Sequence, residues 1–138
     1  MPGPLLVGYD GTPGAKTAAA EALALASELG AEVVFVFAYW TNPGGGEVAD
    51  MLRALRELGE GHLREAQALA EAAGVTSSGE LANAVPSVAL VELADRHDAR
   101  LIAVGSYGEA PLKGALIGST AHKLVHLSER PVLVVRAQ

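Results

Sequence analysis

The sequence predicts a doubly wound α/β fold, in which a five-stranded parallel sheet carries helices on both faces. Aliphatic runs alternate along the 138 residues with segments of helical periodicity. This alternation is typical of a parallel sheet whose strands are joined by right-handed helical crossovers. The run 33–39 is apolar on both faces, as a central parallel strand is. No repeat or linker divides the chain, so we expect one domain over residues 1–138.

The first strand is expected at Leu5–Tyr9, where a short aliphatic run ends at the turn-forming segment 10–14. An alanine-rich helix follows from Pro13, and Gly30 marks its end. Proline is favoured in the first helical turn and glycine just beyond the last, so both residues support these bounds. The apolar strand 33–39 comes next.

A long helix is predicted over residues 47–73, with Gly74 after it. Gly59 and Gly61 should weaken the middle of this helix, because glycine disfavours helical backbone. Apolar or weakly polar residues that recur every three or four positions define the face that we expect to be buried. They are Met51, Leu55, Leu58, His62, Ala66, Leu69 and Ala73.

The second half of the chain continues the alternation of strands and helices. Thr76–Val85 is taken as the third strand, although its alternation of apolar and polar residues is poor. Pro86 opens a helix that closes at the polar segment 95–98. The remaining elements are a strand at 101–104, a helix near 119–127 and a strand at 131–135.

The composition narrows the class of protein. Half of the residues are hydrophobic and 19% are charged, which favours an ordered domain. The net charge of −6 argues against a nucleic acid or an anionic membrane as the main partner. There is no cysteine, which excludes thiol catalysis, disulfides and thiolate metal sites. The longest apolar run, Val33 to Trp40, is too short for a membrane helix, and the first residues lack the pattern of a signal peptide. We therefore expect a cytoplasmic protein.

In doubly wound sheets, ligands bind beyond the carboxyl ends of the strands, where the strand order reverses. Three segments of the sequence follow predicted strands in this way: Gly8–Gly11, Ala38–Trp40 and 105–108. These segments are where we expect the chemistry of the protein.

The most informative pattern is Gly105-x2-Gly108-x9-Gly118-Ser119, which follows a buried strand and opens a helix. Glycine at the end of a strand lets a ligand approach the backbone closely. The first turn of the helix offers free amides, and Ser119 and Thr120 add hydroxyls, which together suit phosphate oxygens. The same glycines could also only shape a turn, with Ser119 capping the helix. Both interpretations stay open on spacing alone.

With its flanking strands, this glycine pattern resembles the ATP-binding branch of the universal stress protein family. The opening Val7-Gly8-Tyr9-Asp10-Gly11 is similar to the first strand of that family and its acidic residue. The resemblance covers essentially the whole chain. It implies a Rossmann-like sheet of strand order 3-2-1-4-5 and a cytoplasmic stress-response protein that binds ATP. It also implies a homodimer.

The resemblance assigns the nucleoside to the ends of the first two strands. Asp10 and its neighbours Gly8 and Tyr9 would hold the nucleoside, and the backbone at Ala38 would contact the adenine edge. The alternative for Asp10 is an Asx turn that bonds its own loop.

The resemblance assigns the phosphates to the glycine pattern. The residues along the ribose and first phosphates would be Gly105, Ser106 and Gly108, and those at the outer phosphates Gly118, Ser119 and Thr120. A divalent cation, Mg or Mn, would accompany the phosphates.

Two departures from the family pattern concern the phosphates. Ala121 stands where ATP-binding relatives often carry a hydroxyl, and Glu109 and Pro111 lie beside the expected phosphate path. Lys113 could offset the charge of Glu109. These residues weaken the case for a triphosphate more than the case for an adenine nucleotide, so AMP and cyclic AMP remain alternatives.

Other motifs in the sequence give no comparable indication of function. Ala15 replaces the glycine that a P-loop needs before Lys16, and His122 and His126 lack a third metal ligand. No serine has a histidine and an acid in an arrangement typical of hydrolases. We therefore expect no catalytic residue and at most slow ATP hydrolysis.

The last strand carries four aliphatic residues that would be left bare at the edge of a sheet. We expect a homodimer in which this strand pairs with its copy through Val132, Leu133, Val134 and Val135. A second class of function remains open, that of a dimeric protein-interaction module which binds no nucleotide.

Overall fold

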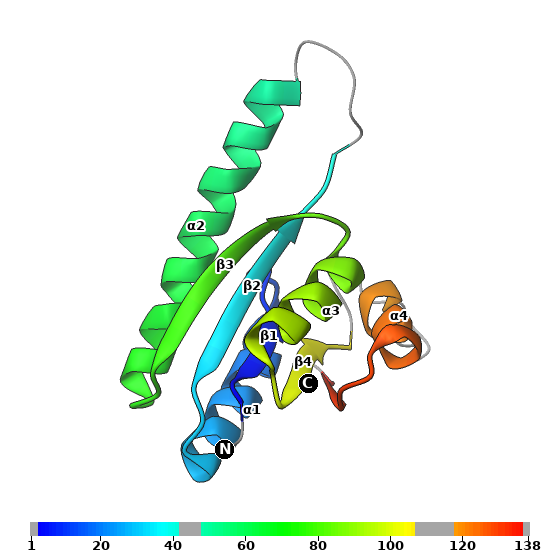
Figure 1. The fold of residues 1–138 in the computed structure, drawn as a ribbon. Helices are drawn as coiled ribbons and strands as arrows, with labels where there is room; N and C mark the ends of the chain where they lie inside the picture. Colours follow the sequence, from blue (N-terminus) through cyan, green and yellow to red (C-terminus); the bar gives the residue numbers. More distant parts are fainter. Residues whose placement is uncertain (1–2, 42–47, 107–117, 137–138) are drawn as a thin grey trace.

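The computed structural model describes residues 3–41, 48–106 and 118–136. It has five parallel strands in the order β3-β2-β1-β4-β5, which confirms the predicted fold (Figure 1). In chain order the elements are β1 (Leu5–Gly8), α1 (Pro13–Leu29), β2 (Val33–Tyr39), α2 (Val48–Ala72), β3 (Ser77–Asn83), α3 (Pro86–His97), β4 (Leu101–Gly105), α4 (Ser119–Leu127) and β5 (Val132–Val135).

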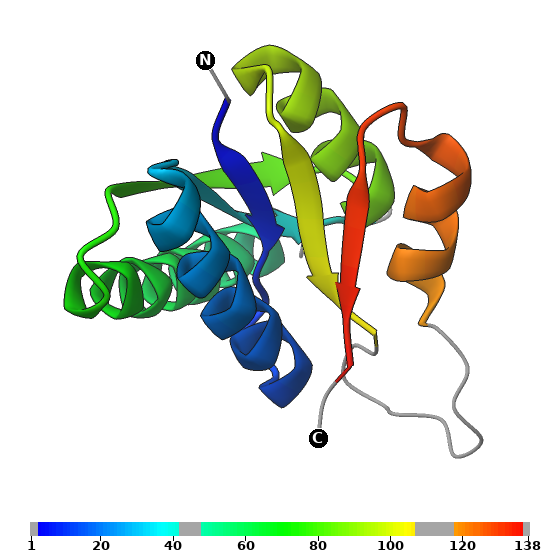
Figure 2. The same cartoon turned by 90° about the horizontal axis from the view of Figure 1, so that it is seen from below.

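The sheet lies between two layers of helices (Figure 2). α1 and α2 cover one face, and α3 and α4 cover the other. Each layer has its own core, since alternate residues of a strand point to opposite faces. In β1, for example, Leu5 and Val7 belong to the core under α1 and α2, whereas Leu6 belongs to the core under α3 and α4.

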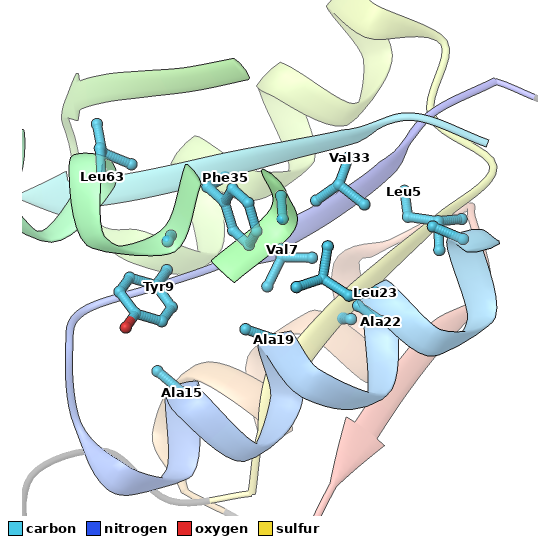
Figure 3. Close-up of a cluster of buried hydrophobic side chains, with 14 of the residues drawn as sticks. Leu5, Val7, Tyr9, Ala15, Ala19, Ala22, Leu23, Val33, Phe35 and Leu63 are labelled. Atoms are coloured by element: carbon cyan, nitrogen blue, oxygen red, sulfur yellow. The ribbon is translucent and has the colours of Figure 1, made fainter. Parts of the chain in front are cut away.

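α1 lies close to the sheet because its buried face is built almost entirely of alanine. Ala18, Ala19, Ala22 and Ala26 are fully buried, and Figure 3 shows Ala19 and Ala22 facing the strand residues. Thr12 caps the amino end of the helix, since its hydroxyl accepts a hydrogen bond from the Ala15 amide at 3.2 Å. This cap holds the segment that leads from β1 into α1.

The predicted buried face of α2 was correct in part. Ala66 is fully buried and Leu55 packs against the core as expected, whereas Met51, Leu58 and Leu69 are exposed. The buried residues of the helix are Gly59, Leu63, Ala66 and Ala70. Gly59 decides the orientation, because a Cβ atom there would lie 2.5 Å from Cδ1 of Phe37. The helix thus contacts the sheet at Gly59, which has no side chain and therefore gives no signal in a pattern of apolar residues.

β3 is shorter than the segment 76–85 that the sequence predicts. It pairs with β2 from Ser77 to Asn83 and forms one edge of the sheet. Several of its residues are exposed, which explains the poor alternation of its sequence. β5 forms the opposite edge.

β1 and β4 are the strands from which the connections run in opposite directions across the sheet. They pair in parallel, with Leu5 opposite Leu101 and Val7 opposite Ala103. Their carboxyl ends therefore lie at the same edge of the fold, which is where doubly wound sheets bind ligands. In the part of the chain that the structure describes, no helix is long and apolar enough to cross a membrane.

Candidate functional site

A crevice opens at the carboxyl ends of β1 and β4. Every predicted binding residue that the structure describes contributes to its lining: Gly8, Tyr9, Asp10, Ala38, Gly105, Ser106, Gly118, Ser119 and Thr120. Gly108, and with it Glu109, Pro111 and Lys113, lies outside the described residues. The topology therefore brings together four segments that are far apart in the sequence.

Asp10 forms the turn that the sequence left open as an alternative. Its Oδ1 atom accepts hydrogen bonds from the Thr12 amide at 3.1 Å and from the Thr12 hydroxyl at 2.6 Å. The Thr12 hydroxyl in turn caps α1, so Asp10 and the helix start form one unit. Oδ2 of Asp10 accepts no hydrogen bond from the described residues, and the side chain is exposed at the crevice. The turn and a ligand contact are thus compatible.

The ring of Tyr9 does not point into the crevice. Because it follows Gly8 in the strand direction, it lies on the opposite face, in the core with Ala15 and Phe35 (Figure 3). Its ring is 6.0 Å from that of Phe35, edge to face, and its hydroxyl donates to Glu65 of α2. Burial and the hydrogen bond with Glu65 raise the pKa of the Tyr9 hydroxyl. Tyr9 still lines the crevice, and its expected role at a nucleoside stays a prediction.

Gly8 points toward the side of the sheet that α3 covers. A Cβ on Gly8 would lie 3.2 Å from Cδ1 of Leu90 and from Cγ1 of Val104. Both of these side chains also line the crevice. Glycine at this position therefore keeps the crevice open above its apolar wall.

Ser106 lies at the base of the crevice with a buried hydroxyl. The residue is 3% exposed, and its amide donates to the Val135 carbonyl at 2.8 Å. Its Oγ atom has no hydrogen-bond partner among the described residues. A buried hydroxyl without a partner is uncommon, because desolvation costs about 1–3 kcal/mol when no hydrogen bond replaces water.

The amino end of α4 lines the crevice beside Ser106. Gly118 precedes the nine-residue helix in extended conformation, and its amide donates to the Ser106 carbonyl. The His122 amide returns to the Gly118 carbonyl at 2.9 Å and is the first intrahelical bond. The amides of Ser119 to Ala121 precede that bond and lack intrahelical acceptors, as at any helix start. They carry the positive end of the helix dipole into the crevice.

The charge of the crevice comes from few groups. Asp10 is the only charged side chain among the described lining residues. An anion would therefore be held by amides and hydroxyls rather than by a cationic side chain of the described part. The cavity measures about 170 Å³, below the roughly 300–1,000 Å³ that is typical of small-molecule sites. The described lining therefore encloses less space than a typical small-molecule site does.

Sequence reasoning missed part of the lining. Thr12 and the apolar residues Val36, Pro86 and Leu90 also border the crevice. Thr12 precedes Pro13, and this pair is a helix-start signal that could have placed it there. The apolar residues carry no such signal, because their side chains resemble ordinary core residues of a strand and a helix.

The histidines do not form a metal site in the described residues. The rings of His122 and His126 lie 4.8 Å apart on α4, but no group of three possible metal ligands occurs in the described part of the chain. His62 stacks on Phe37 at 5.8 Å between ring centres. His97 of α3 pairs with Glu80 of β3.

The fold and the crevice match a known family. The model of the universal stress protein family aligns with residues 1–136. The chain belongs to the universal stress protein family. A universal stress protein of Methanocaldococcus jannaschii is 31% identical over 137 residues, covering 96% of this chain and 81% of the relative. A longer one from Mycobacterium tuberculosis is 33% identical over 138 residues, and this chain spans only 45% of its length.

One of the similar solved structures of the universal stress protein family contains a ligand. It is a universal stress protein in complex with cAMP, and it superposes with a TM-score of 0.80 at 30% sequence identity. The match covers 99% of this chain and 98% of the relative. The resemblance inferred from the glycine pattern is thus confirmed at the level of family and fold.

Proposed function

We propose that this universal stress protein binds an adenine nucleotide in the crevice between β1 and β4 and acts as a nucleotide-dependent binding or signalling module. The observation that carries the proposal is the Ser106 hydroxyl, which is buried in the crevice and has no hydrogen-bond partner among the described residues. A ligand oxygen would satisfy it, and the free amides of the α4 start would face the phosphate beside it. The related structure that contains cAMP supports a nucleotide of adenine.

ATP is the first candidate, because the sequence carries the glycine pattern of the ATP-binding branch. The adenine would lie on Val36 and Leu90 near the backbone of Ala38, with the phosphates at Gly118, Ser119 and Thr120. Mg or Mn would be held mainly by the phosphates, since the described residues offer no cluster of metal ligands.

AMP or cyclic AMP is the second candidate, and one feature of the crevice favours it. The described lining has no positive side chain, and Asp10 is negative. A helix start supplies only about half of a positive charge, which suits one phosphate better than three. The relative in complex with cAMP is consistent with this choice.

The protein is proposed to be a binder rather than a fast catalyst. None of the described lining residues near the amino end of α4 has a basic side chain, so any ATP hydrolysis should be slow. We further propose that it works in the cytoplasm in a stress response, as the family name and the lack of cysteine suggest.

The dimer remains part of the proposal. β5 is an edge strand with the sequence VLVV, and Val132, Leu133 and Val134 are only partly buried. Pairing of this edge with its copy would protect it from unspecific association. Light scattering at micromolar concentration should give the mass of a dimer, and a monomeric mass would refute the pairing.

Thermal unfolding with Mg-ATP, AMP and cyclic AMP tests the nucleotide. A ligand at 100 times its dissociation constant stabilises the native state by about 2.7 kcal/mol. Mg-tripolyphosphate serves as the control for unspecific binding of anions. Gly118→Val should abolish the shift by filling the crevice at the start of α4, with the circular dichroism spectrum unchanged.

The same experiment decides between the classes of function. A shift only with AMP or cyclic AMP would favour the second candidate over ATP. If no nucleotide raises the unfolding temperature, the protein is an interaction module that binds no nucleotide, and the proposal is wrong.

A further inference from the structure

The loop between β1 and α1 carries Asp10 and forms one wall of the crevice. The side of the loop that faces the crevice is open to a ligand. Its opposite side packs on α2, a helix that contributes no residue to the lining of the crevice. The contacts between this loop and α2 therefore decide where the wall stands.

Tyr9 makes the first of these contacts. Its backbone amide is fixed to the Val36 carbonyl at 2.8 Å, and its hydroxyl donates to the Glu65 carboxylate. Tyr9 lies between Gly8 and Asp10, which both line the crevice. A hydrogen bond to an ionised acceptor is stronger than one between neutral groups. Glu65 thus holds the end of β1 from the far side of the sheet.

Gly11 makes the second contact. It has a positive φ of 79°, and a Cβ atom at this position would collide with the ring of His62. His62 cannot easily retreat, because its ring stacks on Phe37. The loop and α2 are therefore in direct contact over two successive turns of that helix.

Glu65 also joins the loop to α1. The Lys16 ammonium lies 3.9 Å from a Glu65 oxygen, and Lys16 stands in the first turns of the helix that the loop begins. The side chains of Lys16 and Glu65 are 55% and 44% exposed, so this ion pair by itself adds little. Its importance lies in its geometry, since one carboxylate contacts the elements on both sides of the loop.

We infer that Glu65 is a positioning residue for the nucleotide crevice, acting through Tyr9 on the backbone that carries Asp10. This inference rests on the proposed function and adds a residue that lies outside the crevice. Without the hydrogen bond, the Tyr9 ring stays packed but the loop samples more conformations. The ligand must then order the loop as it binds, which lowers its affinity.

Two measurements on the full chain test this role. The first is hydrogen exchange of the Thr12 amide, which is protected by Oδ1 of Asp10 and reports the loop without any ligand. The second is the dissociation constant of the nucleotide that gives the largest thermal shift. The variants are Glu65→Ala, Glu65→Gln and Tyr9→Phe, with Glu71→Ala as the control, because Glu71 is exposed further along α2.

We expect Glu65→Ala and Tyr9→Phe each to speed exchange of the Thr12 amide and to raise the dissociation constant about three- to tenfold, the range of one hydrogen bond. The double variant should be no worse than either single one, because both remove the same bond. Glu65→Gln keeps an acceptor oxygen and should restore most of the affinity. Glu71→Ala should match the unchanged protein.

The outcomes separate this inference from the proposed function. Equal Thr12 exchange in Glu65→Ala and Glu71→Ala would overturn the positioning role, whatever the nucleotide does. Faster exchange in a protein that binds no nucleotide would support the positioning of the loop and overturn the proposed function. An additive double variant would show that Glu65 acts by a route other than Tyr9.

Discussion

The backbone of Gly14, in the first turn of α1, lies directly against Gly105 at the end of β4. A Cβ atom on Gly105 would be 2.7 Å from the Gly14 carbonyl oxygen and 2.8 Å from its carbonyl carbon. Gly105 therefore accommodates a helix of the protein itself as well as bordering the crevice. Ser106 follows Gly105 in the chain, and the loop that carries Asp10 leads into the helix turn that contains Gly14. The close approach of the two glycines therefore brings Ser106 and the Asp10 loop to the same opening.

Gly105→Ala should destabilise the fold by about 1–3 kcal/mol, because the added methyl group meets backbone that cannot rotate away. Gly8→Ala is the control in the neighbouring strand. Its Cβ would meet side-chain atoms of Leu90 and Val104 at 3.2 Å, and these can shift by a few tenths of an ångström. Urea unfolding should show a larger loss for Gly105→Ala than for Gly8→Ala, and the reverse order would contradict this account.

Two glycines of α2 should respond to alanine with opposite signs. Gly59→Ala places a methyl group 2.5 Å from side-chain atoms of Phe37 and Leu81, and overpacking should cost about 1–3 kcal/mol. Gly61→Ala meets nothing nearer than an Arg64 nitrogen at 3.9 Å and should stabilise the helix by about 0.5–1 kcal/mol. Thermal or urea unfolding of both variants checks the pair. A gain from Gly59→Ala would mean that α2 packs differently on the sheet.

Ser106→Ala should affect stability and binding in opposite directions. Removing a buried hydroxyl that has no partner among the described residues should leave the free protein as stable or up to about 1 kcal/mol more stable. The nucleotide should bind up to about tenfold more weakly, because one hydrogen bond is lost. Calorimetric titration measures the affinity. Ser87→Ala is the control, since Ser87 is equally buried in α3 but outside the crevice lining, and it should not change the affinity.

Stability should fall at alkaline pH because of Tyr9. Burial and Glu65 raise the pKa of its hydroxyl in the folded protein, whereas an unfolded tyrosine ionises near pH ~10. Below that pH the contribution to stability is complete. Above it the unfolded state loses a proton that the folded state keeps, so stability declines by about 1.4 kcal/mol per pH unit for this group. Urea unfolding from pH 8 upward should show a shallower decline in Tyr9→Phe, and parallel curves would exclude Tyr9 as the cause.

The fold and the place of the crevice could be predicted because they follow from local signals. Aliphatic runs, Pro13 and Gly30 mark the elements, and parallel strands necessarily bring the residues after β1 and β4 to the same edge. The family resemblance then supplied the order of the strands. These arguments need no knowledge of which side chains touch.

The contacts behind the crevice could not be predicted, because they depend on pairs far apart in the chain. Tyr9 and Glu65 are 56 positions apart, and neither carries a pattern that points to the other. Part of the buried face of α2 was missed for a related reason. The helical periodicity assigned large apolar residues such as Leu58 to the buried face, whereas the helix meets the sheet at Gly59, where the absence of a side chain is what matters.

The crevice is assembled from chain segments near residues 8–12, 36–38, 86–90, 104–106 and 118–121. No two neighbouring elements form it alone, so a chain that has folded only its first half has no site. A ligand of the crevice should therefore not change any folding step that precedes the meeting of these segments. Ligand binding would then report that all of these segments have come together.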